Sequence, residues 1–395
     1  MSWKYNPDSK IFGREELTNN LYDFFSLKDF NFSKEILTQY YLSLKTKPFV
    51  IFSGISGTGK TKIAQLFAEY VCQNDSDDEK NRRMAFVAVR PDWMDQKGLL
   101  GYFNILDEKY HSTKVLDLLL NAAEEKDEPF FVVLDEMNLA KVEHYFSDFL
   151  SILESRTPDK PEGEAIVLHP FPEVKDERGR KIPGEVHIPP NVFFTGTVNV
   201  DESTYMFSPK VLDRANIIEF NDVDLKFYAG RSTVDNSSIA LQNGEVLDRL
   251  FNRKNYRVCS KQDYLILPDQ AKVQIENVHD ILKEYNLHFG YRVANELGRF
   301  IALALEEVGE SALDDAIDVQ ILQKILPKLH GTRAKLEEPL RKLLNFCQGG
   351  VGTISNNQSE TPANVDKELR FPRSYRKISR MLKQLSLQGY ASFVE

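Results

Sequence analysis

An eight-residue stretch, GISGTGKT at positions 54–61, has the residue types and spacing that bind the phosphates of a nucleotide. Its three glycines permit a tight turn whose backbone N–H groups point at phosphate oxygens. Lys60 supplies a positive charge for the β and γ phosphates, and Thr61 offers a hydroxyl to Mg²⁺. We therefore predict a phosphate-binding loop whose contacting residues are Gly54, Ile55, Ser56, Gly57, Thr58, Gly59, Lys60, Thr61 and Lys62.

Two adjacent carboxylates, Asp135 and Glu136, have the chemistry that phosphoryl transfer also needs. One carboxylate must complete the Mg²⁺ sphere, and a second group must polarise the attacking water. We assign Asp135 to the metal and Glu136 to the water. Asn199 follows a later apolar run and could orient that water or the γ-phosphate, although an asparagine at a strand end is more often a turn former.

The elements that must position these groups alternate between strands and helices. The predicted strands lie at 48–52, 84–89, 130–134, 192–198 and 217–220. The run at 130–134 is apolar throughout, as in a parallel sheet covered by helices on both faces. An amphipathic helix follows the phosphate-binding loop, and a β-hairpin insertion is expected within 157–190. We predict an α/β fold with a parallel sheet flanked by helices, followed by a C-terminal helical lid domain.

Changes in periodicity divide the chain into four predicted segments, since 395 residues exceed one ordinary core. The segments are lead-in helices (1–46), the α/β nucleotide-binding core with its hairpin insertion (47–222), an irregular insertion (223–270) and the helical lid domain (271–395).

Composition and charge limit the class of protein. With a net charge of -9, the surface as a whole repels nucleic acid, so any DNA contact needs a local patch. Three cysteines without C-x-x-C spacing argue for a reducing compartment and against a zinc site. Neither a secretory signal nor a membrane-spanning run is visible, so we expect a cytoplasmic protein with no membrane partner. A basic stripe near helical spacing indicates either a DNA patch or, more commonly, a solvated face; it comprises Arg373, Arg376, Lys377, Arg380 and Lys383.

The stretch RPDWMDQKGLLGYFN, residues 90–104, allows two further interpretations. Its PD and DQK letters are similar to a metal-dependent nuclease pattern, but they are too close in sequence to lie on two adjacent strands, and we reject a nuclease site. Its apolar residues could face the pore of a ring, which we favour, or form a surface loop folded on its own aromatics; they are Trp93, Leu99, Leu100 and Tyr102.

Taken in order, the phosphate-binding loop, the LDE run, the strand-terminal Asn199 and the later Arg214 resemble an AAA+ ATPase-type module. The resemblance narrows to the McrB-related branch, the motor subunits of modification-dependent restriction systems. It is carried by LSLKTKPFVIFSGISGTGKT, RPDWMDQKGLLGYFN, LDEMNLAKVEHYFSDFLSILE, GTVNVDEST with SPKVLDRANIIEF, FGYRVANELGRF and ILPKLHGTRAKLEEPL. The branch has an MNTADR run where this chain reads VNVDES at 198–203, so GTP, which the resemblance favours, and ATP both stay open.

The resemblance also implies roles for individual residues. Lys60, Thr61, Asp135 and Glu136 match the Walker A and Walker B positions, and Asn199 matches sensor I. Arg214 falls where AAA+ rings place an arginine finger that reaches the neighbouring subunit's nucleotide. Arg292 resembles sensor II, with a surface charge on an amphipathic helix as the alternative.

The implied protein is a homo-oligomeric ring, expected to be a hexamer, that hydrolyses GTP or ATP with Mg²⁺. It would drive a separate nuclease subunit of the McrC type in DNA restriction and defence, and the assembly would contact DNA. The alternatives are a MoxR-like chaperone that remodels a protein partner and a nucleotide-gated scaffold that binds without turnover.

Overall fold

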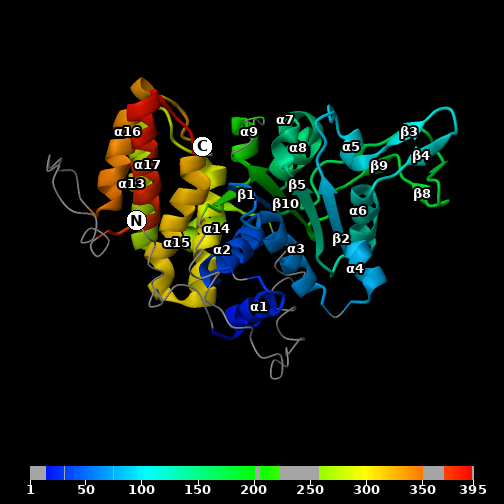
Figure 1. Cartoon of the computed structure of the whole chain (residues 1–395), viewed down its shortest axis with the longest axis horizontal. Helices are drawn as coiled ribbons and strands as arrows, with labels where there is room; N and C mark the ends of the chain where they lie inside the picture. Colours follow the sequence, from blue (N-terminus) through cyan, green and yellow to red (C-terminus); the bar gives the residue numbers. More distant parts are fainter. Residues whose placement is uncertain are drawn as a thin grey trace. The chain divides into compact units, whose positions relative to one another are not determined.

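The computed structural model describes residues 15–30, 32–73, 75–200, 205, 207–221, 258–349 and 369–393, with the side chains of 15–20 left undescribed. The described residues fall into two compact units, of which the first runs from Glu15 to Val258 and the second begins at Cys259 (Figure 1). No helix in these segments is long and apolar enough to cross a membrane.

A five-stranded sheet forms the centre of the first unit, and every neighbouring pair of strands is parallel. The strand order is β11-β1-β10-β5-β2. The strands are β1 (Phe49–Gly54), β2 (Met84–Ala88), β5 (Phe130–Asp135), β10 (Val192–Asn199) and β11 (Asn216–Glu219). The three central strands are almost wholly buried, because helices cover both faces, and this explains why most of their residues are apolar. The predicted α/β fold with a parallel sheet is confirmed.

Helices α2 (Lys34–Thr46) and α3 (Lys60–Val71) lie on one face of the sheet (Figure 1). Tyr40 of α2 contacts both Phe52 of β1 and Phe67 of α3, with ring centroids 4.8 and 4.9 Å apart. The other face is covered by α8 (Ser147–Ser155), where Phe149 packs 5.5 Å from Phe194 of β10. Helix α8 is preceded by the short helix α7 (Val142–Tyr145), and the two are separated at Phe146.

The remaining helices of the first unit surround this core. The lead-in segment contains α1 (Glu15–Leu27) and α2, as predicted. Helix α6 packs against β2 and β5, and α4 packs against β2. The bounds are α4 (Asp77–Arg83), α5 (Lys97–Leu100), α6 (Lys114–Glu124) and α9 (Pro209–Leu212).

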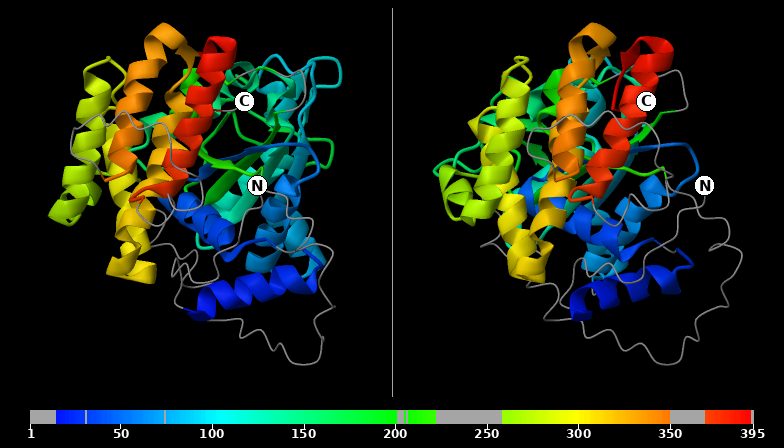
Figure 2. Two further views of the ribbon diagram at one scale, coloured as in Figure 1. Left: turned by 60° about the vertical axis from the view of Figure 1, so that its left-hand side comes forward. Right: turned by 90° about the vertical axis from the view of Figure 1, so that its left-hand side faces the viewer.

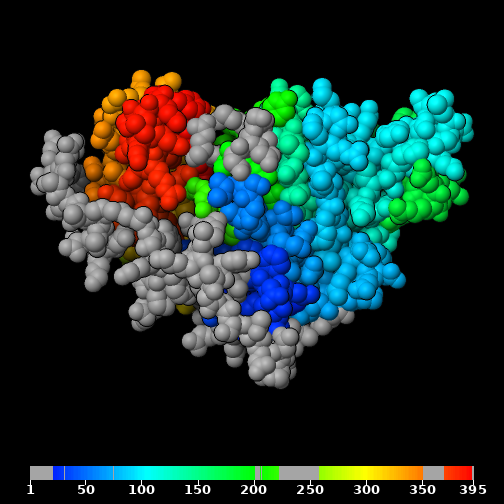
Figure 3. All heavy atoms as spheres, in the orientation of Figure 1, coloured from blue at the N-terminus to red at the C-terminus, as the bar shows by residue number. Residues whose placement is uncertain are grey.

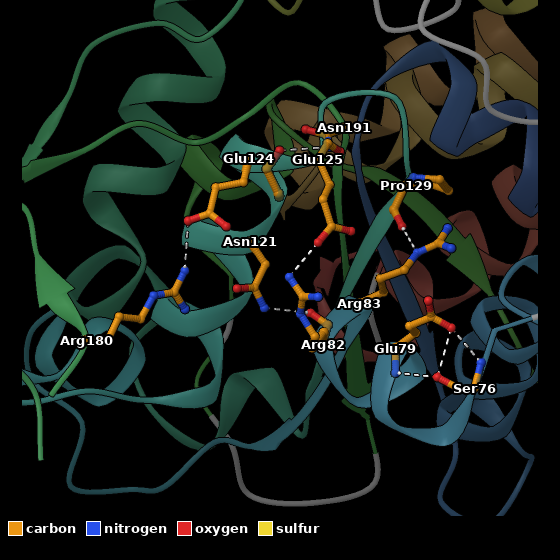
Figure 4. Close-up of polar contacts among 11 residues, drawn as sticks. Ser76, Glu79, Arg82, Arg83, Asn121, Glu124, Glu125, Pro129, Arg180 and Asn191 are labelled. Atoms are coloured by element: carbon orange, nitrogen blue, oxygen red, sulfur yellow. Dashed lines mark hydrogen bonds and ion pairs between the residues drawn. The ribbon is translucent and has the colours of Figure 1, made fainter. Parts of the chain in front are cut away.

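Polar contacts fix where β5 and β10 begin, at the end of the sheet opposite the phosphate-binding loop (Figure 4). Asn191, which is 1 % exposed, accepts from the N–H of Phe130 at 2.8 Å. Its Nδ2 donates to three main-chain carbonyls at 2.8 to 3.2 Å, those of Ala122, Glu125 and Glu128. Arg83 donates to the carbonyl of Pro129 at 3.1 Å and pairs with Asp75. These contacts therefore hold the residues that directly precede β5 and β10 in place.

Three small hairpins extend from this unit, in cyan and green at the right-hand edge of Figure 3. Strand β3 (Tyr102–Asn104) pairs with β4 (Lys109–His111), β6 (Ile166–Val167) with β9 (Glu185–Val186), and β7 (Val174–Lys175) with β8 (Lys181–Ile182). The pairing of β6 with β9 confirms the hairpin predicted within 157–190. His111 joins two of the hairpins, because its Nε2 lies 2.9 Å from Asp107 and its Nδ1 2.9 Å from Glu177.

The expectation that the apolar residues of 90–104 line a pore is wrong for two of them. Leu99 and Leu100 are 1 % and 0 % exposed, since α5 packs against α6 and α7. Trp93 is half-buried against Tyr145, with ring centroids 5.4 Å apart. Only Tyr102 of the four is exposed. Of these four residues, Leu99 and Leu100 therefore belong to the core.

The second unit is helical, as predicted, and Figure 2 shows its long helices from two sides. Its helices are α12 (Lys261–Leu265), α13 (Asp269–Lys283), α14 (Tyr291–Val308), α15 (Leu313–Gln320), α16 (Arg333–Cys347) and α17 (Pro372–Gln388). A π-helical turn at Ile321–Ile325 follows α15, and β12 (Gly331–Thr332) pairs with β13 (Tyr390–Ala391). Helix α12 lies within the range expected to be irregular, whereas 222–257 and 350–368 lie outside the described residues.

The basic stripe of α17 does not form one solvated face. Arg373 donates to Asp315 at 2.9 Å and lies 3.5 Å from the buried Asp318, both on α15. Lys377 is 5 % exposed, with its ammonium 4.3 Å from the ring centroid of Phe393. Arg380 and Lys383 are exposed. The stripe therefore serves the packing of α17 at its start and faces solvent further along, which corrects the expectation of one solvated face; a DNA contact stays a prediction.

Glu337 on α16 is flanked by Arg333 and Arg341, one turn away on either side. Hydrogen bonds from these two arginines lower the pKa of Glu337 to about 2. The cluster is exposed, so its contribution to stability is small and sensitive to salt.

Candidate nucleotide-binding site

The phosphate-binding loop connects β1 to α3, as its flanks predict. Gly57 and Gly59 have φ of 79° and 94°, a region that residues with a Cβ rarely adopt. Gly54 is needed for a different reason, because a Cβ there would lie 2.1 Å from the carbonyl oxygen of Phe220. The tip of the loop is exposed at Ile55, Ser56 and Gly57. A loop of this form can place successive N–H groups around a phosphate.

Lys60 is the first residue of α3, and its side chain is turned back over the loop. Its Nζ donates to the carbonyls of Gly54 at 2.9 Å and Ile55 at 2.5 Å, and the residue is 5 % exposed. The ammonium therefore lies at the loop, where a β or γ phosphate would be bound. The loop is also held by the segment that follows β11, because the side-chain oxygen of Asn221 accepts from the N–H of Ile55 at 3.1 Å.

Two oxygens suited to Mg²⁺ lie together beside the loop. Thr61 Oγ1 donates to Asp135 Oδ1 at 2.6 Å, although the two residues are 74 positions apart in the chain. Hydroxyl and carboxylate oxygens are the hard ligands that Mg²⁺ prefers alongside water and phosphate oxygens. The pair fits the metal assignment, and Mg²⁺ held there would neutralise charge on the phosphates.

Glu136 is placed by an unusual turn at the end of β5. It has φ of 52° and ψ of 49°, in the left-handed region. Asn199, at the end of β10, donates from Nδ2 to Glu136 Oε1 at 3.4 Å. Strand register brings Asn199 beside Gly54, the first residue of the loop. The structure therefore joins the predicted water-polarising carboxylate, the predicted orienting amide and the phosphate-binding loop.

The other predicted site residues lie elsewhere. Lys62 is exposed, with its ammonium 5.8 Å from the ring centroid of Phe30. Arg214 is bound within its own chain: it donates to the carbonyls of Leu150 at 3.0 Å and Lys210 at 2.6 Å and forms an ion pair with Glu154. Arg292 is in the first turn of α14, in the second unit, and its sensor II role stays a prediction.

Two residues of the site were missed by the sequence analysis. Thr197 Oγ1 donates to Asp135 Oδ1 at 2.6 Å and accepts from the N–H of Glu136 at 3.0 Å. Asn138 donates from Nδ2 to the carbonyl of Asn199 at 3.3 Å. Thr197 stands two residues before Asn199 in the same strand, so the period-two alternation of strands would have placed both on one face.

Comparison with known proteins agrees with this geometry. Residues 49–215 match the AAA domain of the dynein-related subfamily, and residues 243–390 match a domain of unknown function (DUF8727). No curated protein matches the chain. Among solved structures, one described as a "putative ATPase" from Cytophaga hutchinsonii is 14% identical, with a TM-score of 0.45, covering 78% of this chain and 87% of that one.

The match to the AAA domain spans the phosphate-binding loop, the carboxylate pair and Asn199, which the fold brings together at one edge of the sheet. Residues 49–215 are an AAA+ domain, and the chain is a P-loop nucleoside triphosphatase.

Proposed function

We propose that this nucleoside triphosphatase is the motor subunit of a modification-dependent restriction system of the McrB-related type. In this proposal the chain assembles into a homo-oligomeric ring, hydrolyses GTP or ATP with Mg²⁺ and drives a separate nuclease subunit of the McrC type on DNA. The observation that carries the proposal is the set of McrB-like motifs, which extends from residue 42 to residue 340 and so includes segments outside the nucleotide site.

The hydrolytic part of the proposal is supported by contacts within the site. Asp135 is hydrogen-bonded to Thr61 and Glu136 to Asn199, so the metal-binding pair and the water-polarising pair are both assembled. A nucleotide-gated scaffold without turnover would not need the second pair. The site residues described above are assigned to phosphates, metal or water, and none of these distinguishes guanine from adenine. The preference for GTP therefore rests on the resemblance.

The ring proposal assigns Arg214 to a neighbouring subunit's nucleotide. Arg214 lies in the turn between α9 and β11, and its side chain is 14% exposed. A guanidinium can fork onto two phosphate oxygens and stays charged at all working pH values. For this role Arg214 must exchange its pairing with Glu154, which is 42% exposed, for a phosphate.

The experiment is a reconstitution with a candidate nuclease subunit of the McrC type. GTP and ATP hydrolysis are measured side by side, with and without that subunit, on methylated and unmethylated plasmid DNA. We expect hydrolysis without the partner, faster hydrolysis with it, and DNA cleavage only when both proteins and the nucleotide are present. Lys60→Ala is the matched control, because it should abolish cleavage while leaving the nuclease subunit intact.

Failure to stimulate hydrolysis or to cleave either DNA would overturn the restriction proposal. Stimulation by a protein substrate in place of the nuclease would favour the MoxR-like chaperone.

A further inference from the structure

Strand β10 carries two buried threonines that point to the same face of the sheet but serve different neighbours. Side chains two residues apart lie on one face of a strand, so Thr195, Thr197 and Asn199 share the face covered by α2 and α3. The hydroxyl of Thr195 lies 2.7 Å from the hydroxyl of Tyr40 on α2. Thr197 instead reaches the end of β5, where the two carboxylates are.

One hydroxyl makes both of the contacts at Thr197. It donates its hydrogen to Asp135 Oδ1 at 2.6 Å and accepts the N–H of Glu136 at 3.0 Å. A threonine hydroxyl has one hydrogen and two lone pairs, so both bonds can exist together. Thr197 is 2 % exposed, which keeps water from competing for either partner.

The N–H that donates to the Thr197 hydroxyl belongs to Glu136, whose backbone conformation is strained. Glu136 has φ of 52° and ψ of 49°, which a residue with a Cβ rarely adopts. Such a conformation persists only where surrounding contacts hold it. The turn directs Glu136 Oε1 to Asn199 and leaves Asp135 facing Thr61.

We propose that Thr197 is a positioning residue for nucleotide hydrolysis, which holds the metal-binding Asp135 and the water-polarising Glu136 in one arrangement. Thr61 also donates to Asp135 Oδ1, but Thr61 is assigned to Mg²⁺. Thr197 is therefore the hydroxyl left to orient Asp135 when the metal is bound, and it fixes the backbone from which Glu136 projects. The proposal depends on hydrolysis alone and not on a ring or a nuclease.

Thr197→Val tests this, because it keeps the shape of the side chain and removes the hydroxyl. Loss of an outer contact to a metal ligand typically lowers activity or metal affinity by about 10–100-fold, and we expect a fall in kcat and a rise in the Mg²⁺ concentration for half-maximal rate in that range. Nucleotide binding measured in EDTA should stay within about twofold of wild type, because the loop and Lys60 are untouched. Thr197→Ser restores the hydroxyl and should recover most of the rate and the Mg²⁺ dependence.

Thr195→Val is the matched control, since it removes a buried hydroxyl from the same face of the same strand. It should leave kcat and the Mg²⁺ dependence unchanged, even if the melting temperature falls. If Thr197→Val fails to fold, Thr197→Cys replaces it: its thiol is a weak hydrogen-bonding group, so it should lose rate relative to Thr197→Ser.

Three results would overturn the proposal. The first is wild-type kcat and Mg²⁺ dependence in the hydroxyl-free variant. The second is a serine variant no better than the valine or cysteine variant. The third is an equal loss in Thr195→Val, which would show that the strand's packing and not the Thr197 contacts sets the rate.

Discussion

Replacing Arg214 by alanine separates a residue that acts across a subunit interface from one that holds its own chain together. The structure shows the contacts that Arg214 makes within its own chain, which are two hydrogen bonds to main-chain carbonyls and an ion pair with Glu154. The ring proposal adds a contact with a neighbouring subunit's γ-phosphate. The two roles predict losses of different size in different measurements.

The contacts within the chain set the loss of stability. Glu154 is 42% exposed, so solvent screens the ion pair and limits it to about 0–1 kcal/mol. Together with the two hydrogen bonds, we expect Arg214→Ala to lower the free energy of unfolding by about 1–3 kcal/mol. A domain stable by about 5–15 kcal/mol stays folded after that loss, so the basal rate of each subunit should hardly change.

An arginine finger is worth much more to the rate. Removing one costs about 10³–10⁵ in kcat, which corresponds to about 4–7 kcal/mol of barrier. Arg214→Ala should then bind nucleotide normally and hydrolyse it slowly at every protein concentration. Glu154→Gln is the matched control: it breaks the ion pair but keeps the guanidinium, so its rate should change by less than about fivefold.

The assay is specific activity against protein concentration, with light scattering to follow assembly. Wild-type activity should rise until rings are complete. Mixing Arg214→Ala with Lys60→Ala should recover activity, because one variant supplies the arginine and the other the phosphate-binding loop. If Arg214→Ala in complete rings hydrolyses at the wild-type rate, or if confirmed mixed rings stay inactive, Arg214 has only the structural role.

Three further predictions concern other parts of the fold. Asn191→Ala should lower the free energy of unfolding by about 1–3 kcal/mol in denaturant titration, because three carbonyls lose their donor; nucleotide affinity should not change, since Asn191 is at the far end of the strands, and an unchanged unfolding midpoint would refute the assigned contacts. Burial raises the pKa of the Cys347 thiol well above its ordinary value, so an alkylating reagent should modify the half-buried Cys259 first in native protein, and equal labelling rates measured by mass spectrometry would contradict this. The hydrogen bonds from its two flanking arginines lower the pKa of Glu337 to about 2, so its stabilising effect is present above its ordinary pKa of 4.5 and is lost as pH falls toward the lowered value. The melting temperature of Glu337→Gln should therefore lie below that of wild type at neutral pH, with a gap that narrows in acid; a gap independent of pH would argue against the pairing.

The sheet and the phosphate site could be predicted from the sequence because their signals are local. Short apolar runs identify the strands, and the five predicted strands coincide with β1, β2, β5, β10 and β11, of which the three central ones are almost wholly buried. The types and spacing of residues 54–61 require a particular turn, and the structure has it. Asp135 and Asn199 were found because each directly follows such a run.

The errors came from contacts between residues distant in sequence. Nothing near Arg373 indicates that Asp315 and Asp318, more than 50 positions away, will pair with it. Leu99 and Leu100 look available in a glycine-bearing loop, yet α5 packs them into the core. The Glu154 that binds Arg214 lies 60 residues upstream, on α8. Such ion pairs and such burial depend on which helices and strands pack together in the fold, and periodicity along the sequence does not predict that packing.

Nucleotide binding and hydrolysis by Glu136→Gln test the central claim most directly. The substitution keeps the shape of the side chain and leaves Lys60, Thr61 and Asp135 in place, but removes the carboxylate that polarises water. We expect nucleotide affinity within about threefold of wild type and a kcat lower by about 10²–10⁴-fold, with nucleotide trapped unhydrolysed in single-turnover experiments. Turnover by Glu136→Gln at the wild-type rate would contradict the assignment of this site as the centre of hydrolysis.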